Sequence, residues 1–250
     1  RENVVKLARM IGYTPKSSRS AVTPVNIDVQ TTFPYPKTVT LFQGLVLNFT
    51  GPDNNNFVFS TDSDQTVSVN SLSGIATFSN LNLYEGVFLT DTFIRDTSER
   101  QRFILTNESA DTTTLKVTVT TGTTTESYLK ATDITKIDGT SKVFFLEESE
   151  YGRPEILFGD NIVGKALLND DVVSVTYTTS TGNGANGLTS FDFIGTLKDN
   201  NSNTITTGIT ASLVSAPDGG AIQESTEEIK FSAPKFYSSF GRAVSTRDYE

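Results

Sequence analysis

An acid-rich stretch in the second half of the chain holds the residues best suited to chemistry. Glu147, Glu148, Glu150, Glu155 and Asp160 fall within one short span. A carboxylate pair can act as general acid and base in hydrolysis, and several carboxylates together can hold calcium. However, no Asp-x-Asp-x-Asp-Gly loop accompanies these acids, and closeness in sequence does not set the separation that a glycosidase needs. We interpret the stretch as a solvated strand end and a turn, with a carboxylate hydrolase as an alternative.

The segment 158–161, Phe-Gly-Asp-Asn, has the residue types of a tight turn. Gly and Asn adopt positive φ at low cost, and an Asp side chain accepts hydrogen bonds from nearby backbone amides. We predict a hairpin turn in which Gly159 or Asn161 has positive φ and Asp160 bonds local amides. The pair Asp170-Asp171, just before an apolar run, is interpreted as a turn that leads into a strand.

Missing residue types exclude several classes of function. The sequence of 250 residues contains no His and no Cys, so it cannot build a Ser-His-Asp triad, a thiolate nucleophile, a Cys/His zinc site or a disulfide. The net charge of −9 and the lack of a dense basic block disfavour nucleic acid. No apolar run approaches the roughly 18 residues of a membrane helix. We predict no metal, cofactor, nucleic-acid partner or membrane partner, whereas carboxylate, Lys, Tyr and Ser chemistry remains possible.

Two further patterns are given no function. The glycine-rich segment 182–187 is only superficially like a phosphate loop, because no helix-forming run follows it and the Walker Lys-Ser/Thr pair is missing. The Asn-x-Ser/Thr triplets at Asn48, Asn107 and Asn200 are frequent by chance and matter only in a secreted chain. We interpret the first as a connection and discount the second.

The elements that would position these residues are mostly strands. Seventeen Phe, eight Tyr and many Thr and Val suit a pleated, half-buried surface. Leu115, Val117 and Val119 alternate with polar residues, which predicts a strand with one face toward water. Segments 53–56 and 199–203 are rich in Asp and Asn and are predicted loop tips. Similar runs predict strands over 25–29, 38–49, 57–60, 74–83, 143–146, 155–158 and 172–178, and a hairpin over 190–214.

Helices are expected only near the ends. Val4, Leu7, Ala8 and Ile11 recur at helical spacing, and Gly12 supplies a stop. The segment 245–248, Ser-Thr-Arg-Asp, has the form of a capping box, yet the sequence stops two residues later. It also lacks an initiator Met, so it reads as a segment of a longer protein.

The fold class expected is mainly β: an elongated multi-module β-rich protein with a short N-terminal helix and helical elements near the C-terminus. A change of composition at 121–126 and the glycine-rich segment supply the internal boundaries. The modules expected are 1–24, an N-terminal helix and entry segment; 25–121, a first β module; 122–187, a second β module with a hairpin; and 188–250, a β hairpin and the start of a helical region.

Several stretches, taken in order, resemble the baseplate J-like and wedge proteins of contractile-tailed bacteriophages. Each motif is weak alone, but the five in order are specific, and they cover most of the chain. One departure is Asn161, where the family commonly has Gly; Asn also enters the left-handed region. The stretches are 7–15 (LARMIGYTP), 77–86 (TFSNLNLYEG) with 101–107 (QRFILTN), 155–165 (EILFGDNIVGK) with 172–177 and 185–187, 219–234 (GGAIQESTEEIKFSAP), and 242–249 (RAVSTRDY).

The resemblance implies a structural subunit of the baseplate wedge, which assembles with other wedge subunits into the ring around the tail hub. It implies self-association and a place in the virion tail baseplate after assembly in the host cytoplasm. It also implies no catalytic residue to transfer and no small-molecule substrate. The alternative is a carbohydrate-binding adhesin or tail-fibre module, which would use Tyr84, Tyr128 or Tyr237 as stacking platforms.

Overall fold

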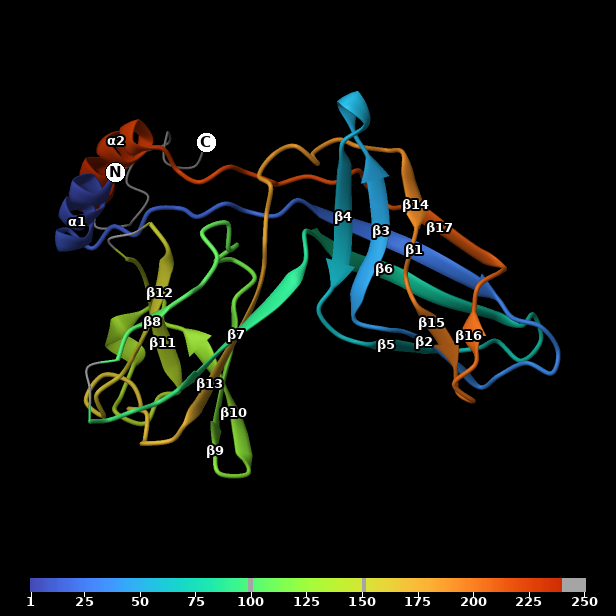
Figure 1. Cartoon of the computed structure of the whole chain (residues 1–250), viewed down its shortest axis with the longest axis horizontal. Helices are drawn as coiled ribbons and strands as arrows, with labels where there is room; N and C mark the ends of the chain where they lie inside the picture. Colours follow the sequence, from blue (N-terminus) through green and yellow to red (C-terminus); the bar gives the residue numbers. More distant parts are fainter. Residues whose placement is uncertain (99–100, 150–151, 240–250) are drawn as a thin grey trace. The chain divides into compact units, whose positions relative to one another are not determined.

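A computed structural model describes residues 1–98, 101–149 and 152–239. The chain is mainly β with one α-helix near each end of the described part, as the sequence predicts (Figure 1). Within that part, no helix is long and apolar enough to cross a membrane. The helices are α1 (Glu2–Met10) and α2 (Thr226–Ser239), with short 3-10 turns at Pro52–Asn54 and Ile134–Lys136.

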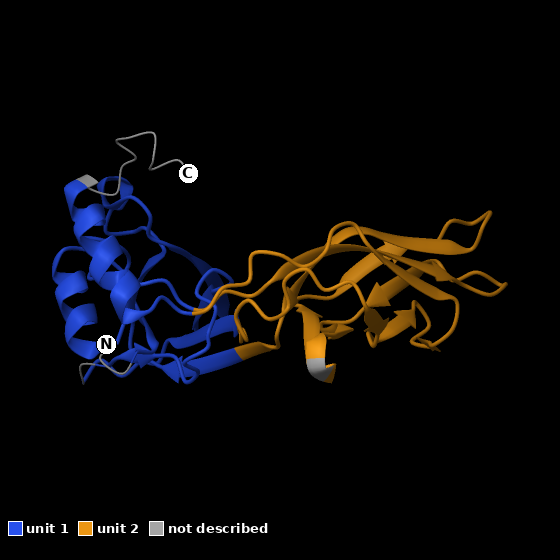
Figure 2. Cartoon of the chain, turned by 90° about the horizontal axis from the view of Figure 1, so that it is seen from above, with its two compact units in different colours: residues 1–17, 90–177, 223–250 blue, residues 18–89, 178–222 orange. Residues whose placement is uncertain are grey.

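The chain forms two compact units, and each is assembled from separate stretches of sequence (Figure 2). Unit 1 contains residues 1–17, 90–177 and 223–250, and unit 2 contains residues 18–89 and 178–222. The contiguous modules expected from composition differ from these units. The expected boundary at 121–126 falls inside unit 1, in the hairpin between β9 (Lys116–Thr121) and β10 (Thr124–Lys130), where Gly122 turns the backbone with a φ of 59°.

Unit 2 consists of two sheets that share one apolar core. The six-stranded sheet has the order β14-β3-β4-β6-β1-β17, and the four-stranded sheet has the order β16-β15-β2-β5. Fully buried side chains from both sheets, including Phe49, Phe59 and Leu197, belong to one cluster. The strands are β1 (Val22–Gln30), β2 (Thr38–Leu41), β3 (Gly44–Thr50), β4 (Asn56–Thr61), β5 (Gln65–Ser68), β6 (Ile75–Glu85), β14 (Phe191–Phe193), β15 (Leu197–Asp199), β16 (Thr204–Ile205) and β17 (Ile209–Leu213).

Unit 1 contains a seven-stranded sheet of order β7-β13-β9-β10-β11-β12-β8. The rings of Phe93 on β7 and Phe103 on β8 lie 5.6 Å apart, so the two edge strands of this sheet come together and the sheet curls. Val117 and Val119 face its core, as their alternation with polar residues predicts. The strands are β7 (Phe88–Ile94), β8 (Phe103–Ile104), β9, β10, β11 (Val143–Glu148), β12 (Pro154–Phe158) and β13 (Val172–Thr178). The division into units falls within β7 and at the end of β13, so Phe88, Leu89 and Thr178 belong to unit 2.

The two helices of unit 1 pack on each other through a small apolar cluster that includes Val5, Ala8, Ile229 and Ala233. Helix α1 ends at a Gly with a φ of 80°, as its sequence predicts: Gly12 N donates to Arg9 O and Tyr13 N donates to Ala8 O, the Schellman arrangement.

The face that α1 buries is a correction to the sequence prediction. Val5 is 2% exposed, whereas Leu7 is 65% exposed. The spacing of apolar residues fits two overlapping faces of so short a helix, and packing against α2 selects the one that contains Val5.

The predicted strands are present, with two differences in pairing. The run 38–49 is divided between β2 and β3, and these lie in different sheets. Within the predicted hairpin 190–214, only β15 and β16 pair with each other, while β14 pairs with β3 and β17 pairs with β1. The predicted tip at 199–203 joins β15 to β16. Local patterns located these strands, but partners distant in sequence decided the sheets.

Candidate functional site

The acid-rich stretch lies largely on the β11–β12 hairpin of unit 1. In the antiparallel register Glu147 is directly opposite Glu155, and Glu148 is opposite Pro154. Two like charges in opposed positions destabilise a pair of strands unless each is compensated. The hairpin therefore needs nearby cations, and three arginines from other segments supply them.

Arg102 compensates the most deeply buried of these carboxylates. The Glu155 side chain is 4% exposed, and its two oxygens accept hydrogen bonds from Arg102 Nε at 2.7 Å and Arg102 Nη2 at 2.6 Å. Arg102 directly precedes β8, whose Ile104 is the register partner of Glu155. The pairing of β8 with β12 thus places the guanidinium, and the bidentate geometry fixes both groups.

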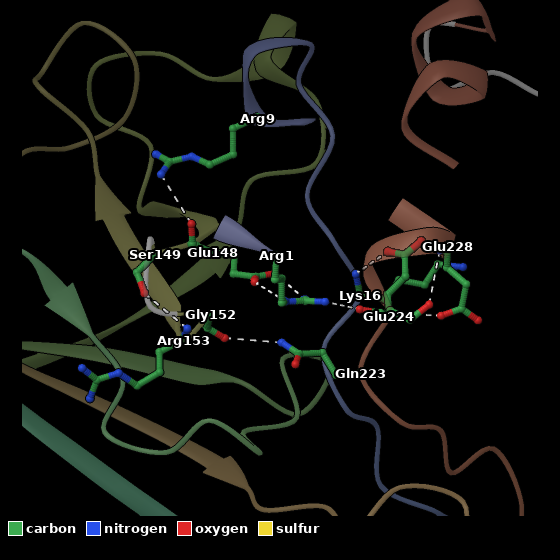
Figure 3. A network of polar contacts seen from close by, with 11 residues as sticks. Arg1, Arg9, Lys16, Glu148, Ser149, Gly152, Arg153, Gln223, Glu224 and Glu228 are labelled. Carbon is green, nitrogen blue, oxygen red and sulfur yellow. Dashed lines mark hydrogen bonds and ion pairs between the residues drawn. The ribbon is translucent and has the colours of Figure 1, made fainter. Parts of the chain in front are cut away.

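Helix α1 brings two arginines to the end of β11 (Figure 3). Arg1 Nε and Nη2 each donate to one oxygen of Glu148 at 3.0 Å. Arg9 donates through Nη2 to the Glu147 carboxylate and through Nη1 to the Glu148 carbonyl oxygen, the latter at 3.4 Å. Burial raises the pKa of Glu148, and the hydrogen bonds from Arg1 oppose that rise. The carboxylate is held by a matched partner, so it is poorly placed to exchange protons with a substrate.

Glu224, just before α2, completes the polar contacts around the helices. Tyr13 Oη donates to the carboxylate of Glu224, 2.8 and 2.9 Å from its two oxygens, and Lys16 N donates to Oε2 at 3.0 Å. Arg1 Nη1 also donates to the Glu224 carbonyl oxygen. Burial, followed by the hydrogen bond to Glu224, raises the pKa of Tyr13 to about 12. The phenol therefore stays protonated and acts as a donor.

We call this set of residues the helix joint. It links α1, the segment before α2 and the end of β11 within unit 1. Its members are Arg1, Arg9, Tyr13, Glu147, Glu148 and Glu224.

The start of α2 is fixed by a capping box that the sequence analysis missed. Ser225 N donates to Glu228 Oε2 at 2.7 Å, and Glu228 N donates to Ser225 Oγ at 3.3 Å. These reciprocal hydrogen bonds satisfy amides that the first turn leaves unpaired. The pattern Ser-x-x-Glu at 225–228 was a readable signal for this helix start.

The space beside the helix joint is too small for a substrate. The cavity lined by Glu147, Glu148 and Gln223 has a volume of about 20 Å³, which holds about one water molecule. Within the described ranges, no group of three or more acidic side chains is arranged to hold a metal ion. The ion pairs and hydrogen bonds of the helix joint fasten the two helices to the sheet.

Asp160 lies apart from the joint, in the turn that follows β12. Its Oδ1 accepts hydrogen bonds from Ile162 N at 2.9 Å and Val163 N at 3.0 Å, and these lower its pKa. Asn161 carries the positive φ, 68°. The prediction of an Asp that bonds local amides beside a residue of positive φ is confirmed.

The same turn differs from the prediction in two respects. No strand follows directly to form a hairpin, because β12 pairs with β11 and β8 instead. Gly159 is required by close approach: a Cβ there would lie 2.1 Å from Gly164 O. A sequence pattern cannot distinguish a glycine needed for its φ from one needed for space.

The remaining acids and the glycine-rich segment have local partners. Asp171 Oδ1 accepts from Thr121 Oγ1 at 2.6 Å and Oδ2 accepts from Leu168 N at 2.8 Å, in a turn that leads into β13 as predicted. In unit 2, the Asn186 side chain donates to Gly220 O at 2.9 Å and accepts from Gly220 N at 3.0 Å. The glycine-rich segment is thus a fastened connection, and β14 follows it.

The asparagines of the Asn-x-Ser/Thr triplets also have structural surroundings. Asn107 Oδ1 accepts from Ser109 N at 2.8 Å, and Asn200 Oδ1 accepts from Lys37 N at 2.7 Å. Asn48 Oδ1 is buried, with no hydrogen-bond partner among the described residues.

Of the tyrosines considered as stacking platforms, Tyr128 is the clearest correction. It is 4% exposed and packs edge-on against Phe158 at 5.6 Å, so its ring is not available to a sugar. Tyr84 is half-buried and has an edge contact with Phe88, and Tyr237 is 57% exposed on α2. Glu150 and the predicted capping box at 245–248 lie outside the described residues.

Sequence reasoning missed the cationic and phenolic members of the joint. Arg1 and Arg9 lie 147 and 138 positions from the hairpin acids that they contact, and Tyr13 lies 211 positions from Glu224. Arg102, which is outside the joint, lies 53 positions from Glu155. The spacing of residues along the sequence cannot predict contacts between segments so far apart. No protein-family model matches the chain, and a search of curated proteins found no significant match.

Proposed function

We propose that the chain is a structural subunit of the baseplate wedge of a contractile-tailed bacteriophage. Its role is to join other wedge subunits in the ring around the tail hub, and it performs no catalysis. The specific assignment rests on the five stretches, in order, that resemble the baseplate J-like and wedge proteins. The geometry of the backbone turns and of the bound carboxylates supports only the broader part of the proposal, namely a structural role.

The observation that carries the structural role is that key residues of those stretches shape the backbone. Gly12 ends α1, and Gly86 has a φ of 100° where a Cβ would lie 1.7 Å from Thr179 O. Gly159 and Asn161 form the turn after β12. Such residues are required by architecture, whereas a catalytic family shares residues that converge on a pocket. This favours a family whose common function is assembly.

The hydrogen bonds and ion pairs of the acidic side chains support the same proposal. Glu147, Glu148 and Glu155 are each bound by an arginine, and Asp160 is bound by backbone amides. A general acid or base must be able to reach a substrate proton. Charged groups that are already bound within the chain in this way suit a structural part better than an enzyme.

Immunogold electron microscopy of intact virions tests the assignment. Antibodies against this chain would be applied to contractile phage particles released by the strain that encodes it, and antibodies against the capsid protein would serve as the matched control. We expect gold at the end of the tail, below the sheath. Label on fibres or the capsid, or no label on particles that the control antibody marks, would overturn the proposal.

A further inference from the structure

A polar recess in unit 2 lies outside the helix joint. Its walls are the segment 30–36, which leads from β1 to β2, and the segment 199–207, which contains the β15–β16 turn and leads toward β17. The recess has a volume of about 400 Å³, within the range of about 300–1,000 Å³ that small-molecule sites occupy. It is therefore large enough for a small ligand.

Hydrogen bonds within the protein fix both walls. Lys37 N donates to Asn200 Oδ1 at 2.7 Å, which ties the two segments together. Gln30 N donates to Gly208 O at 2.8 Å, where the backbone approaches so closely that only glycine fits. Asp199 accepts two hydrogen bonds of 2.8 Å from backbone amides of its own turn. A recess with fixed walls loses little conformational entropy when a ligand binds.

The lining offers hydroxyl and amide groups that the protein does not use. Thr32, Thr204, Thr206 and Thr207 line the recess and are exposed, and their hydroxyls make no hydrogen bond with any described residue. The side-chain nitrogen Nδ2 of Asn201 likewise makes no hydrogen bond with any described residue. A threonine hydroxyl both donates and accepts, and an amide nitrogen donates. Pro34 and Pro36 add apolar rings to the same wall.

The charge of the residues that line the recess disfavours anionic ligands, and their polarity disfavours apolar ones. Asp199 is the one ionisable residue among the described lining residues, and hydrogen bonds, first that from the Asn203 side chain, lower its pKa, so it is anionic at neutral pH. A phosphate or other anion would meet this negative charge, and the described lining residues include no lysine or arginine to compensate it. Calcium takes six to eight oxygen ligands, usually with several carboxylates, and an apolar ligand would leave the hydroxyls unpaired.

We propose that this recess binds a neutral saccharide. Sugar hydroxyls would donate hydrogen bonds to, and accept them from, the threonine hydroxyls, and would accept one from Asn201 Nδ2. The Asp199 carboxylate can accept one further hydrogen bond from a sugar hydroxyl. The apolar face of a sugar ring would lie on the prolines. This saccharide site does not depend on the proposed assembly role. Sugar binding is measured on the isolated chain, whereas the assembly role is tested by where the chain lies in a virion.

NMR titration of the isotopically labelled full chain tests the proposal. The probes are glucose, galactose, N-acetylglucosamine, maltose, lactose and chitobiose, with inorganic phosphate and calcium chloride as competing classes. We expect at least one sugar to give saturable shift changes confined to 30–36 and 199–207. No saturable change up to about 10 mM sugar, a concentration that detects millimolar affinity, would overturn the proposal, as would changes mapped elsewhere or binding of phosphate or calcium instead.

Valine variants provide the matched control. Thr206→Val and Thr204→Val keep the side-chain shape and remove a hydroxyl from the recess, whereas Thr189→Val removes an exposed hydroxyl elsewhere in unit 2. Loss of one hydrogen bond should weaken sugar binding about fivefold in at least one recess variant and leave Thr189→Val unchanged. Equal affinity in all three variants would contradict the proposed site.

Discussion

Unit 2 and the helix-bearing part of unit 1 are stabilised by different interactions. In unit 2, two sheets bury side chains such as Phe49, Phe59 and Leu197 completely in one core. In unit 1, the helices share only a small apolar cluster, and buried carboxylates paired with arginines fasten neighbouring segments. Apolar burial depends little on pH, whereas charged contacts depend on the protonation of each partner. One chain thus combines a core whose stability depends little on pH with a helix joint whose contacts depend on protonation.

The largest effect expected is from a cavity in the core of unit 2. Phe59 is fully buried, with its ring 4.7 Å from that of Phe49. Phe59→Ala should lower the free energy of unfolding by about 3–5 kcal/mol. Hydrogen exchange read by mass spectrometry would follow the two units separately, with Leu72→Ala, at a position 92% exposed, as the control. Loss of protection in unit 1 but not in unit 2 would contradict the proposed division.

The second effect is from an unpaired carboxylate in unit 1. Arg102→Ala leaves Glu155 buried without its bidentate partner and should cost about 2–3 kcal/mol, below the full cost of breaking a buried pair because the arginine is partly exposed. Lys6→Ala removes the exposed pair with Glu2 and should cost less than about 0.5 kcal/mol. Urea unfolding measures both variants. Equal costs would mean that burial does not govern the strength of these ion pairs.

The third effect separates shape from charge in the turn after β12. Gly159→Val places a side chain where Gly164 O lies 2.1 Å from the Cβ, and should cost about 1–3 kcal/mol. Asp160→Asn keeps the acceptor for Ile162 N and Val163 N and should shift the urea midpoint much less. A folded Asp160→Asn protein that lost a defined hydrolytic activity would count against the structural interpretation of this turn.

The smallest effect is a pH dependence in unit 1. Hydrogen bonds, first that from the Ser141 hydroxyl, lower the pKa of Asp138 from 3.8 to about 2. Because the folded-state pKa is depressed, the resulting stability is present above the unfolded value and is lost as pH falls through about 2. Asp138→Asn should be less stable than the parent chain at pH 7, and the two should converge toward pH 2. Urea unfolding across this range measures it; parallel curves would refute the assignment.

Local sequence patterns determined the element types and several turns. Alternation at 115–119 predicts β9, the Gly after α1 predicts where that helix ends, and the residues at 158–161 predict a turn with Asp160 bonded to amides. These succeed because helix period, strand period and left-handed φ are properties of neighbouring residues. The absence of His and Cys likewise removes whole classes of chemistry before any fold is known.

Tertiary structure alone decided the partners. Composition could not show that β2 and β3 belong to different sheets, that unit 1 is built from three stretches, or that the burial of Val5 leaves Leu7 exposed. The acid-rich stretch is the clearest case, because Glu148 and Arg1 are 147 positions apart. Whether a carboxylate catalyses or fastens depends on what lies within hydrogen-bond distance, and contacts between segments far apart in the sequence set that distance.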